Sequence, residues 1–527
     1  MRRRRRAQLT GVASEQPLPL LLPSGGSPQR VAPTANALPV LNSNMIKWKV
    51  MRRRAAYLGL CALMLTACSG LPQLDLSEII VRAAATPVVV IEDTDATPVP
   101  ATLSTAALVK RRSAVRIGIR YDAPPLARVN EAGELEGMDV DLAREFARRW
   151  LGSERNAEFV QVTTATAAER VARREVDLAL GGLTIQRSAE RTVDFSIAYL
   201  GDGEAILTRV GEFTDFRSLA RRRVTYIDFA TVVALGDIQA ATNLTVALQA
   251  RNTYQAAIGD LLDGATDGVA GRLRRLRVAV AENSALSIPI MLTSEPVAIM
   301  LPPDDSAWAD LVNLTLAAMM ADGTFRRLHE RWFGTAPEPL EVIPQPLPPS
   351  LASLPNTRAP KNTLSDIRAA QGIRVGFDPQ AAPFSALNDA GQPTGYEVAL
   401  VREMARRWFG NPGRAQFLPL TADQIADALA SGTVQLAVGG IPRTGQNEQR
   451  LDFALTTFSS AGVPLAIALP ANDSGLRDLV NFTLQDMLAD GTLGRIFQRW
   501  FPDQPLPAIP RWLGSEPGAA ALLTGES

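Results

Sequence analysis

Residues Val176 to Ser196 read VDLALGGLTIQRSAERTVDFS, and much of this stretch returns at Val434 to Ala454 as VQLAVGGIPRTGQNEQRLDFA. In each copy a short apolar run predicts a buried strand, a Gly-Gly pair follows it, and an Asp-Phe pair closes the segment. Glycines at the carboxyl end of a strand leave backbone N–H groups uncovered by side chains, and in open α/β sheets ligands bind outside such strand ends. A strand-Gly-Gly turn can also be only a tight connection, so the surrounding sequence has to decide.

The residues on either side of the first copy predict alternating strands and helices. Val115, Ile117 and Ile119 alternate with arginines, which is typical of a half-buried strand. From Asp141 to Trp150, apolar residues recur every four positions on one face of a helix. Strand, helix and strand in this order give a parallel sheet with right-handed crossovers. The sequence therefore predicts an α/β fold.

The repeat extends well beyond the opening stretch. Residues 115–196 align with 373–454 at a constant offset of 258 and without a gap. Residues 296–333 align with 464–501 at an offset of 168, and 22 of these 38 positions are identical. The second copy therefore lacks about ninety residues between its Phe453 and its Pro464.

Several short motifs lie in a fixed order along the first copy: the strand from Val115, Pro124-Pro125, GMDVDL at 137–142, the Gly-Gly strand with Asp-Phe-Ser, and RWFG at 331–334. This combination resembles the family 3 periplasmic solute-binding proteins, the polar amino-acid receptors of ABC importers. The resemblance covers about Val115 to Gly334. It implies a periplasmic-binding-protein-like, two-lobed (Venus-flytrap) module, in which the chain forms lobe one, crosses to lobe two and returns.

The gap in the second copy falls at the two crossing points that the resemblance implies. The second copy is therefore expected to be a single-lobe α/β repeat whose partner lobe has been cut out. The expected organisation is a leader at 1–50, a signal segment at 51–67, a tether at 68–113, the complete module at 114–335 (lobe one 114–196 and 296–335, lobe two 197–295), a Pro-rich linker at 336–371, the partial repeat at 372–502 and a disordered tail at 503–527.

A short apolar segment near the start predicts export. Met51-Arg-Arg-Arg54 is basic, residues 55–67 are an apolar run of 13, and Leu65-Thr-Ala-Cys68 ends in cysteine. Thirteen residues are too few to span a membrane as a helix. The segment looks like a bacterial lipoprotein signal, which implies lipidation of Cys68, loss of Cys61 and an extracytoplasmic, membrane-anchored chain without disulfides.

Overall charge excludes some classes of partner. Lysine and arginine together number 54, as do aspartate and glutamate, so no global field attracts nucleic acid or an acidic membrane. The five arginines at 2–6 could bind nucleic acid in isolation, but the surrounding residues, rich in Pro, Ser and Gly, favour a disordered leader or an over-extended gene start.

Position by position, the resemblance carries over only part of a ligand site. Gly182 and Thr184 stand at the carboxylate-binding positions, whereas Leu126 and Thr164 replace aromatic residues, and Ala189 replaces the carboxylate-binding arginine with Arg187 two residues away. Arg120 and Arg272 stand where acidic residues would hold an ammonium group. The predicted ligand-binding residues are Arg120, Tyr121, Leu126, Thr164, Gly182, Thr184, Arg187, Thr231 and Arg272.

The two arginines at ammonium-binding positions would repel an amine and favour an anion, since arginine does not lose its charge. Alternatively, Arg272 belongs only to a solvated helix face and Arg120 to a rim. The leading expectation is an extracytoplasmic lipoprotein that delivers a small polar or anionic solute, amino-acid-like or a carboxylate, to an ABC permease. The alternative is a receptor-derived sensory or interaction lipoprotein that no longer serves transport.

Catalysis has little support in the sequence. The single histidine, His329, is expected on the polar side of its helix, and one histidine assembles neither a Ser-His-Asp relay nor a histidine metal site. Some relatives of the fold are dehydratases with a carboxylate in the cleft, and Asp228 could serve, although a turn residue is the simpler interpretation. We expect no enzyme activity, no cofactor and no metal.

Overall fold

The computed structural model describes residues 99–338, 343–344, 346–507, 509–512 and 519–524, all of which belong to one compact unit, Arg82–Ser527. The predicted leader, signal segment and Cys68 lie outside the described residues. Among the described residues, no helix is long and apolar enough to cross a membrane.

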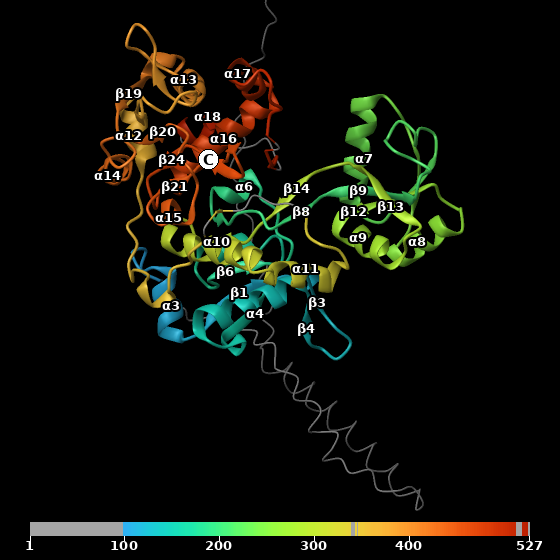
Figure 1. The fold of residues 1–527 in the computed structure, drawn as a ribbon. Helices are drawn as coiled ribbons and strands as arrows, with labels where there is room; N and C mark the ends of the chain where they lie inside the picture. Colours follow the sequence, from blue (N-terminus) through green and yellow to red (C-terminus); the bar gives the residue numbers. More distant parts are fainter. Residues whose placement is uncertain (1–98, 339–342, 345, 508, 513–518, 525–527) are drawn as a thin grey trace, which may run out of the picture. The chain divides into compact units, whose positions relative to one another are not determined.

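Lobe one is a five-stranded sheet in the order β5-β1-β6-β15-β7 (Figure 1). β1 runs parallel to β5 and β6, whereas the returning strand β15 is antiparallel to β6 and β7. The strands are β1 (Val115–Ile119), β5 (Ala157–Gln161), β6 (Leu178–Leu180), β7 (Asp194–Phe195) and β15 (Met300–Leu301), with a small sheet of β2 (Asp122–Ala123), β3 (Ala127–Val129) and β4 (Leu135–Glu136). The helices are α3 (Thr105–Arg112), α4 (Met138–Leu151), η1 (Glu154–Asn156), α5 (Ala167–Ala172), α6 (Arg187–Glu190), α10 (Ser306–Ala321) and α11 (Thr324–Phe333).

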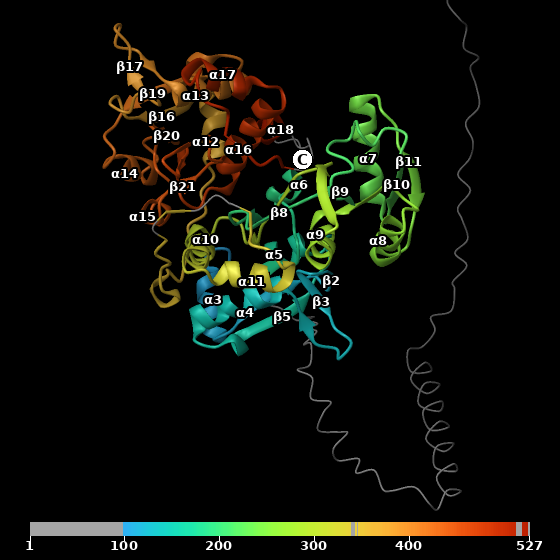
Figure 2. The same ribbon diagram turned by 45° about the vertical axis from the view of Figure 1, so that its right-hand side comes forward.

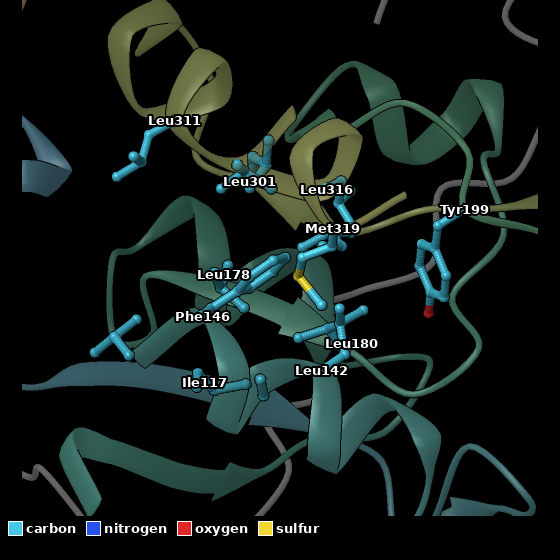
Figure 3. Packing of buried hydrophobic residues seen from close by; sticks show 14 of the residues in the cluster. Ile117, Leu142, Phe146, Leu178, Leu180, Tyr199, Leu301, Leu311, Leu316 and Met319 are labelled. Carbon is cyan, nitrogen blue, oxygen red and sulfur yellow. The ribbon is translucent and has the colours of Figure 1, made fainter. Parts of the chain in front are cut away.

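The core of lobe one lies between this sheet and helices α4, α10 and α11. Figure 3 shows Phe146 of α4 among Leu178, Leu180 and Met319, and all four side chains are fully buried. Full burial of such a side chain contributes about 1.5–3 kcal/mol. The predicted period-four face of α4 therefore packs on the sheet, and Gly152 ends the helix in the left-handed region at φ 81°.

Lobe two is a second five-stranded sheet in the order β11-β10-β12-β9-β13, with the three helices α7 to α9 around it (green and yellow-green in Figure 1). Two strands, β8 and β14, pair antiparallel between the lobes and carry the chain across and back. The elements are β8 (Leu200–Asp202), β9 (Glu204–Arg209), β10 (Arg223–Tyr226), α7 (Phe229–Thr242), β11 (Ala247–Ala250), α8 (Tyr254–Leu262), β12 (Gly268–Arg272), α9 (Leu273–Glu282), β13 (Leu286–Met291) and β14 (Glu295–Val297).

The second repeat rebuilds the sheet of lobe one in the order β19-β16-β20-β24-β21, and Figure 2 shows β16, β19 and β20 beside α12 and α13. Its register follows the first copy, since Ile373 pairs with Ala415 as Val115 pairs with Ala157. The elements are α12 (Thr363–Ala370), β16 (Ile373–Phe377), β17 (Ala386–Leu387), β18 (Pro393–Thr394), α13 (Tyr396–Phe409), η3 (Pro412–Arg414), β19 (Ala415–Pro419), α14 (Ile425–Ala430), β20 (Leu436–Val438), α15 (Gly445–Glu448), β21 (Asp452–Phe453), β22 (Phe458–Ser460), β23 (Val463–Leu465), β24 (Ala468–Leu469), α16 (Ser474–Ala489), α17 (Thr492–Trp500) and α18 (Ala519–Thr524).

A hairpin closes the second repeat at the place where the first module crosses to lobe two. Phe458 pairs with Leu465 in β22 and β23, at the positions equivalent to Leu200 and Val297 in β8 and β14. Ala461 and Gly462 make the turn with φ of 48° and 80°, values that suit a tight two-residue connection. Both crossing strands are therefore kept, and a two-residue turn stands in place of lobe two.

Three segments expected to be irregular are partly helical. α3 lies inside the predicted tether, and Ser104 caps it while its hydroxyl donates to the carbonyl of Pro355, 2.6 Å away. Helix α12, together with η2 (Leu351–Ser353), lies inside the predicted linker. α18 lies inside the predicted disordered tail, where Trp512 is also buried. These predictions were wrong for those residues because packing against the two repeats stabilises short helices that local composition does not favour.

Candidate functional site

The Gly-Gly turn after β6 is the centre of the lobe-one half of the site. Gly181 has φ 113°, and a Cβ there would lie 2.7 Å from the Cβ of Arg120, so only glycine fits. Gly182 has φ 68°, and a Cβ there would lie 2.9 Å from a methyl group of Leu126. Leu126 is fully buried and therefore supports the turn as a core residue.

The amides of this turn are not uncovered, contrary to the prediction from sequence. The N–H groups of Gly181 and Gly182 donate to one carboxylate oxygen of Asp139, at 2.9 and 3.1 Å. The hydroxyl of Tyr199 donates to the same oxygen at 2.8 Å. Burial raises the pKa of Asp139 to about 6. Asp139 therefore occupies the amide donors that we expected a ligand carboxylate to use.

The second repeat contains the same hydrogen-bonded arrangement of an acidic side chain and the two glycine N–H groups. Glu397 takes the position of Asp139, and its carboxylate accepts the N–H groups of Gly439 and Gly440 at 2.7 and 2.9 Å. An acidic residue opening the helix after the first strand is thus part of the Gly-Gly turn in both copies. Its presence in both copies was a sequence signal for this role that our prediction missed.

The lobe-two half of the site lies at the ends of β10 and β12 and the start of β9. Thr231 donates its hydroxyl proton to Glu204 at 2.6 Å, and Arg272 lies 3.3 Å from the same carboxylate. Arg272 also donates to Glu295 at 2.6 Å. Burial raises the pKa of Glu204 to about 7. The structure thus brings two predicted residues, Thr231 and Arg272, together through an acidic residue that was not predicted.

Arg272 and Arg120 each form ion pairs with carboxylates. Their charges are therefore compensated, which removes the basis for the predicted repulsion of amines. Arg272 is paired with two carboxylates, and the Nε of Arg120 donates to Asp122 at 3.0 Å. Glu204 and Glu295 were missed because they lie at the crossing between the lobes, where Glu295 opens β14 and Glu204 opens β9 just after β8, rather than at the family's ligand positions. The available sequence signal was an acidic residue on each side of the chain segment that forms lobe two.

The two halves meet beside the hinge strands. The guanidinium of Arg274, from lobe two, lies about 3.7 Å from the place where a Cβ of Gly182 would stand, and it is paired with Asp202 of β8. Asp202 also accepts the backbone N–H of Arg274 at 3.1 Å. A charged group of lobe two therefore reaches the Gly-Gly turn of lobe one.

The remaining predicted residues have other surroundings. Tyr121 is partly buried against the lobe-one core, and burial raises its pKa. Thr184 is buried, and its backbone forms an isolated antiparallel β-bridge with that of Val297. Thr164 is exposed. Arg187 lies against the second repeat, where its Nη1 donates to Asp486 at 2.6 Å, and it does not line the cleft.

A cavity of about 710 Å³ lies between the lobes, where Pro124 and Pro125 face α8 and α9. Tyr254 lines it and accepts the backbone N–H of Arg272 at 2.9 Å. The cavity lining includes none of the nine predicted ligand residues, so it flanks the predicted site.

Two residues considered for catalysis have structural partners. Asp228 caps α7, because its carboxylate accepts the N–H of Thr231 at 3.0 Å, and the hydroxyl oxygen of Thr231 lies 2.9 Å from the same carboxylate oxygen. His329 is buried rather than on a polar face, because its ring stacks on Phe333 and bonds to the carbonyl of Thr335 at 2.7 Å. Within the described ranges, no group of three or more His, Cys, Asp or Glu residues could hold a metal ion.

Two lobes on separate sheets, joined by a pair of antiparallel strands, define a hinged solute-binding protein. The family model for bacterial extracellular solute-binding proteins, family 3, matches residues 115–335 and 373–503. The chain belongs to this family.

The curated relatives include binding proteins for several amino acids. The chain is 26% identical over 236 residues to an ABC transporter glutamine-binding protein of Bacillus subtilis, covering 44% of this chain and 86% of the relative. It is 23% identical over 225 residues to an ABC transporter arginine-binding protein of Escherichia coli, covering 42% and 90%. Among solved structures, an ancestral cationic amino acid solute-binding protein covers 44% of this chain and all of its own, with 23% identity and a TM-score of 0.39.

Proposed function

We propose that the first module binds a small polar solute of amino-acid type between its lobes and delivers it to the permease of an ABC importer. The observation that supports this most is the acidic end of lobe two, where Glu204 and Glu295 both pair with the guanidinium of Arg272 and Asp228 lies on the other side of Thr231 from Glu204. Carboxylates in excess of guanidinium groups favour an ammonium ion, which every α-amino acid carries. The relatives that bind glutamine and arginine agree with this class of solute.

This proposal replaces the preference for anions that the sequence suggested. That preference required two unpaired arginines, and both are ion-paired. An amine entering beside Arg272 would meet the carboxylates that already compensate it. We therefore expect amino acids to bind better than carboxylates of the same size that lack the amine.

A sensory or interaction role without transport is the second candidate. It is favoured by the loss of the aromatic ligand positions, now held by Leu126 and Thr164, and by the occupation of the Gly-Gly amides by Asp139. In either role we propose binding rather than catalysis, because Asp228 and His329 have structural partners.

A thermal-shift screen of the full chain tests the proposal, with glutamine, arginine, glutamate and histidine against succinate. At a concentration of about 100 Kd, a true ligand adds roughly 2.7 kcal/mol of stability. Asp228→Asn, which keeps the shape of the side chain, should weaken binding of that amino acid at least tenfold. The matched control is Asp263→Asn, at an exposed position of the same lobe. Stabilisation by succinate alone would refute the amino-acid class, and no stabilisation by any of the five would favour the second candidate.

We also propose that the chain is held at a membrane outside the cytoplasm through a lipid on Cys68. The motif LTAC at 65–68 supports this, as does the family, whose members are extracellular. A lipid chain would anchor the protein without a spanning helix.

A further inference from the structure

A second cavity, of about 580 Å³, lies between lobe one and the second repeat. It is separate from the cleft of the proposed function, since its lining comes from α10, α16 and the segments around β7 and β21. Its lining contains four carboxyl groups and two guanidinium groups: Glu190, Asp310, Glu448 and Asp452, with Arg443 and Arg477. The acidic groups are therefore in excess.

Two of these carboxyl groups, Glu190 and Asp310, receive no hydrogen bond from an N–H or hydroxyl donor and form no ion pair within the described part of the chain. Asp310 is 8% exposed, and within the described part of the chain no N–H or hydroxyl group donates to its carboxylate, which lies near that of Glu448. Glu448 is paired with Arg443, Asp452 accepts the hydroxyl of Ser306 at 2.9 Å, and Glu190 lies near Arg477 and Asp478. A buried carboxyl group without a partner is costly, because it has lost water and gained nothing in exchange.

The surroundings of Asp310 leave it two ways to avoid an unpaired negative charge. Burial raises its pKa well above the ordinary value, and the negative charges of Glu448 and Asp452 raise it further, against the opposing effect of Arg443 and Arg477. The carboxyl group can therefore hold a proton, or it can face a cation inside the cavity. The volume of the cavity is large for a bare ion and suits a small molecule.

Two asparagines in the same lining indicate what else the molecule carries. The side-chain oxygen of Asn313 accepts the N–H of Ile197 at 2.9 Å, and that of Asn481 accepts the N–H of Leu455 at 2.8 Å. With these oxygens held, the amide N–H groups remain as donors, and neither donates to another described residue. Donors of this kind require an oxygen acceptor in the molecule that they meet.

We propose that the cavity between lobe one and the second repeat is a binding site for a small organic ammonium compound that also carries an oxygen acceptor, with Asp310 as its counter-ion. The ammonium group donates to the carboxylate of Asp310, and the oxygen accepts from Asn313 or Asn481. Arg477 stands where the first module has Ala309, and Arg443 stands where it has Ile185, so both guanidinium groups of the cavity come from the second repeat. Asp310 is left facing the cavity.

Calorimetric titration of the full chain tests the proposal with two matched pairs of probes. Ethanolamine and 4-aminobutanoate carry the amine and an oxygen, whereas ethylene glycol and butanoate lack the amine. We expect at least one of the two amines to bind with one-to-one stoichiometry, and neither amine-free compound to bind. Asp310→Asn removes the charge and keeps the shape of the side chain, so it should weaken binding of the amine at least tenfold.

The cleft and the cavity are distinguished by a second variant. Asp228→Asn, in the cleft, should leave binding of the amine in the cavity unchanged. Binding that is equally tight in Asp310→Asn, or that is lost in Asp228→Asn, would overturn the proposal, as would the absence of binding by both amines. Equal binding of Mg²⁺ at the same site would also overturn it, because an organic ligand would then not be required.

Discussion

The hydroxyl of Ser306 donates a hydrogen bond of 2.9 Å to the carboxylate of Asp452, and so joins the first module to the second repeat. The reciprocal bond is also present, since Ser474, the counterpart of Ser306, donates to Asp194 at 2.8 Å. Exchange of the same bond in both directions is the signature of a two-fold, self-complementary interface. The two copies therefore meet within one chain as two subunits meet in a symmetric dimer.

The backbone next to these serines repeats the exchange. The N–H of Asp304 donates to the hydroxyl of Ser474 at 2.9 Å, and the N–H of Asn472 donates to that of Ser306 at 2.7 Å. A lobe one without its partner lobe has thus gained a different partner, the lobe one of the complete module.

Removal of the central guanidinium of this interface should destabilise the chain. Arg477 lies between Asp194 and Asp452 and is 15% exposed. Arg477→Ala leaves two buried carboxylates without their counter-ion, which costs about 3–5 kcal/mol in comparable cases. We expect a fall of about 3 kcal/mol in the free energy of unfolding, measured with urea. Arg499→Ala, on an exposed face of α17, is the control and should change this energy by less than about 0.5 kcal/mol. A change of less than about 0.5 kcal/mol in Arg477→Ala would show that these ion pairs contribute nothing to the free energy of unfolding.

Stability should fall as pH rises from about 4.5 to 8. Burial raises the pKa of Glu190 to about 8 and that of Asp452 to about 7. In this range the folded chain holds protons that the unfolded chain has released, so raising the pH favours unfolding. Calorimetry at pH 5, 6.5 and 8 should show a falling Tm, and Glu190→Gln should reduce the slope. A slope unchanged from that of Glu131→Gln, an exposed control, would contradict this assignment.

The Gly-Gly turn should depend on Asp139. Asp139→Ala leaves the N–H groups of Gly181 and Gly182 and the hydroxyl of Tyr199 without their acceptor. Each unpaired buried group costs about 1–3 kcal/mol, so we expect a loss of at least about 3 kcal/mol in the free energy of unfolding. Denaturant unfolding measures it, with Glu131→Ala as the exposed control. Equal stability of the two variants would mean that water replaces the carboxylate.

The fold followed from the sequence because its signals are local and occur twice. The alternation at Val115 to Ile119 and the period-four face ending at Trp150 gave the sheet and helix of lobe one, and the change of offset located the missing lobe. The site was predicted less well, because its side chains were assigned only by their positions in the family's sequence pattern. Arg187 has the expected position in the chain but contacts Asp486, because the second repeat covers it.

The errors at the site share one physical cause. Asp139, Glu204 and Glu295 act through contacts between segments that are far apart in the sequence, so their positions could mark them as candidates but could not identify their partners. Arginines were recognised by position, but the carboxylates that neutralise them were not. The charge of a site therefore could not be derived until the fold had brought its counter-ions together.

Membrane anchoring should depend on Cys68. If a lipid on this residue holds the chain, Cys68→Ala should move the protein from the membrane fraction to the soluble fraction, because no spanning helix exists among the described residues. Carbonate-washed membranes and the soluble fraction are compared by immunoblot. Cys61→Ala, the control, should remain membrane-bound. A Cys68→Ala protein that stays in washed membranes would disprove the lipid anchor.

The second repeat should fold alone and should not close on a solute. Its sheet is complete, Phe377, Met404 and Phe482 are buried in its core, and a two-residue turn replaces lobe two. Closure needs two lobes and a hinge. Residues 360–527 expressed alone should therefore melt cooperatively, and no amino acid should reduce the radius of gyration in X-ray scattering.

The fragment 365–505 is the matched comparison for this last experiment. It lacks Asn362, which caps α12, and Trp512, which is buried in the same core and whose backbone N–H donates to the side-chain oxygen of Gln485 at 3.1 Å. Loss of a cap costs about 1 kcal/mol, and removal of a buried tryptophan costs about 3–5 kcal/mol. We expect the shorter fragment to melt at a lower temperature than residues 360–527. Equal Tm values would show that the tail does not belong to the core, and a solute that compacts either fragment would show that half a module can still close.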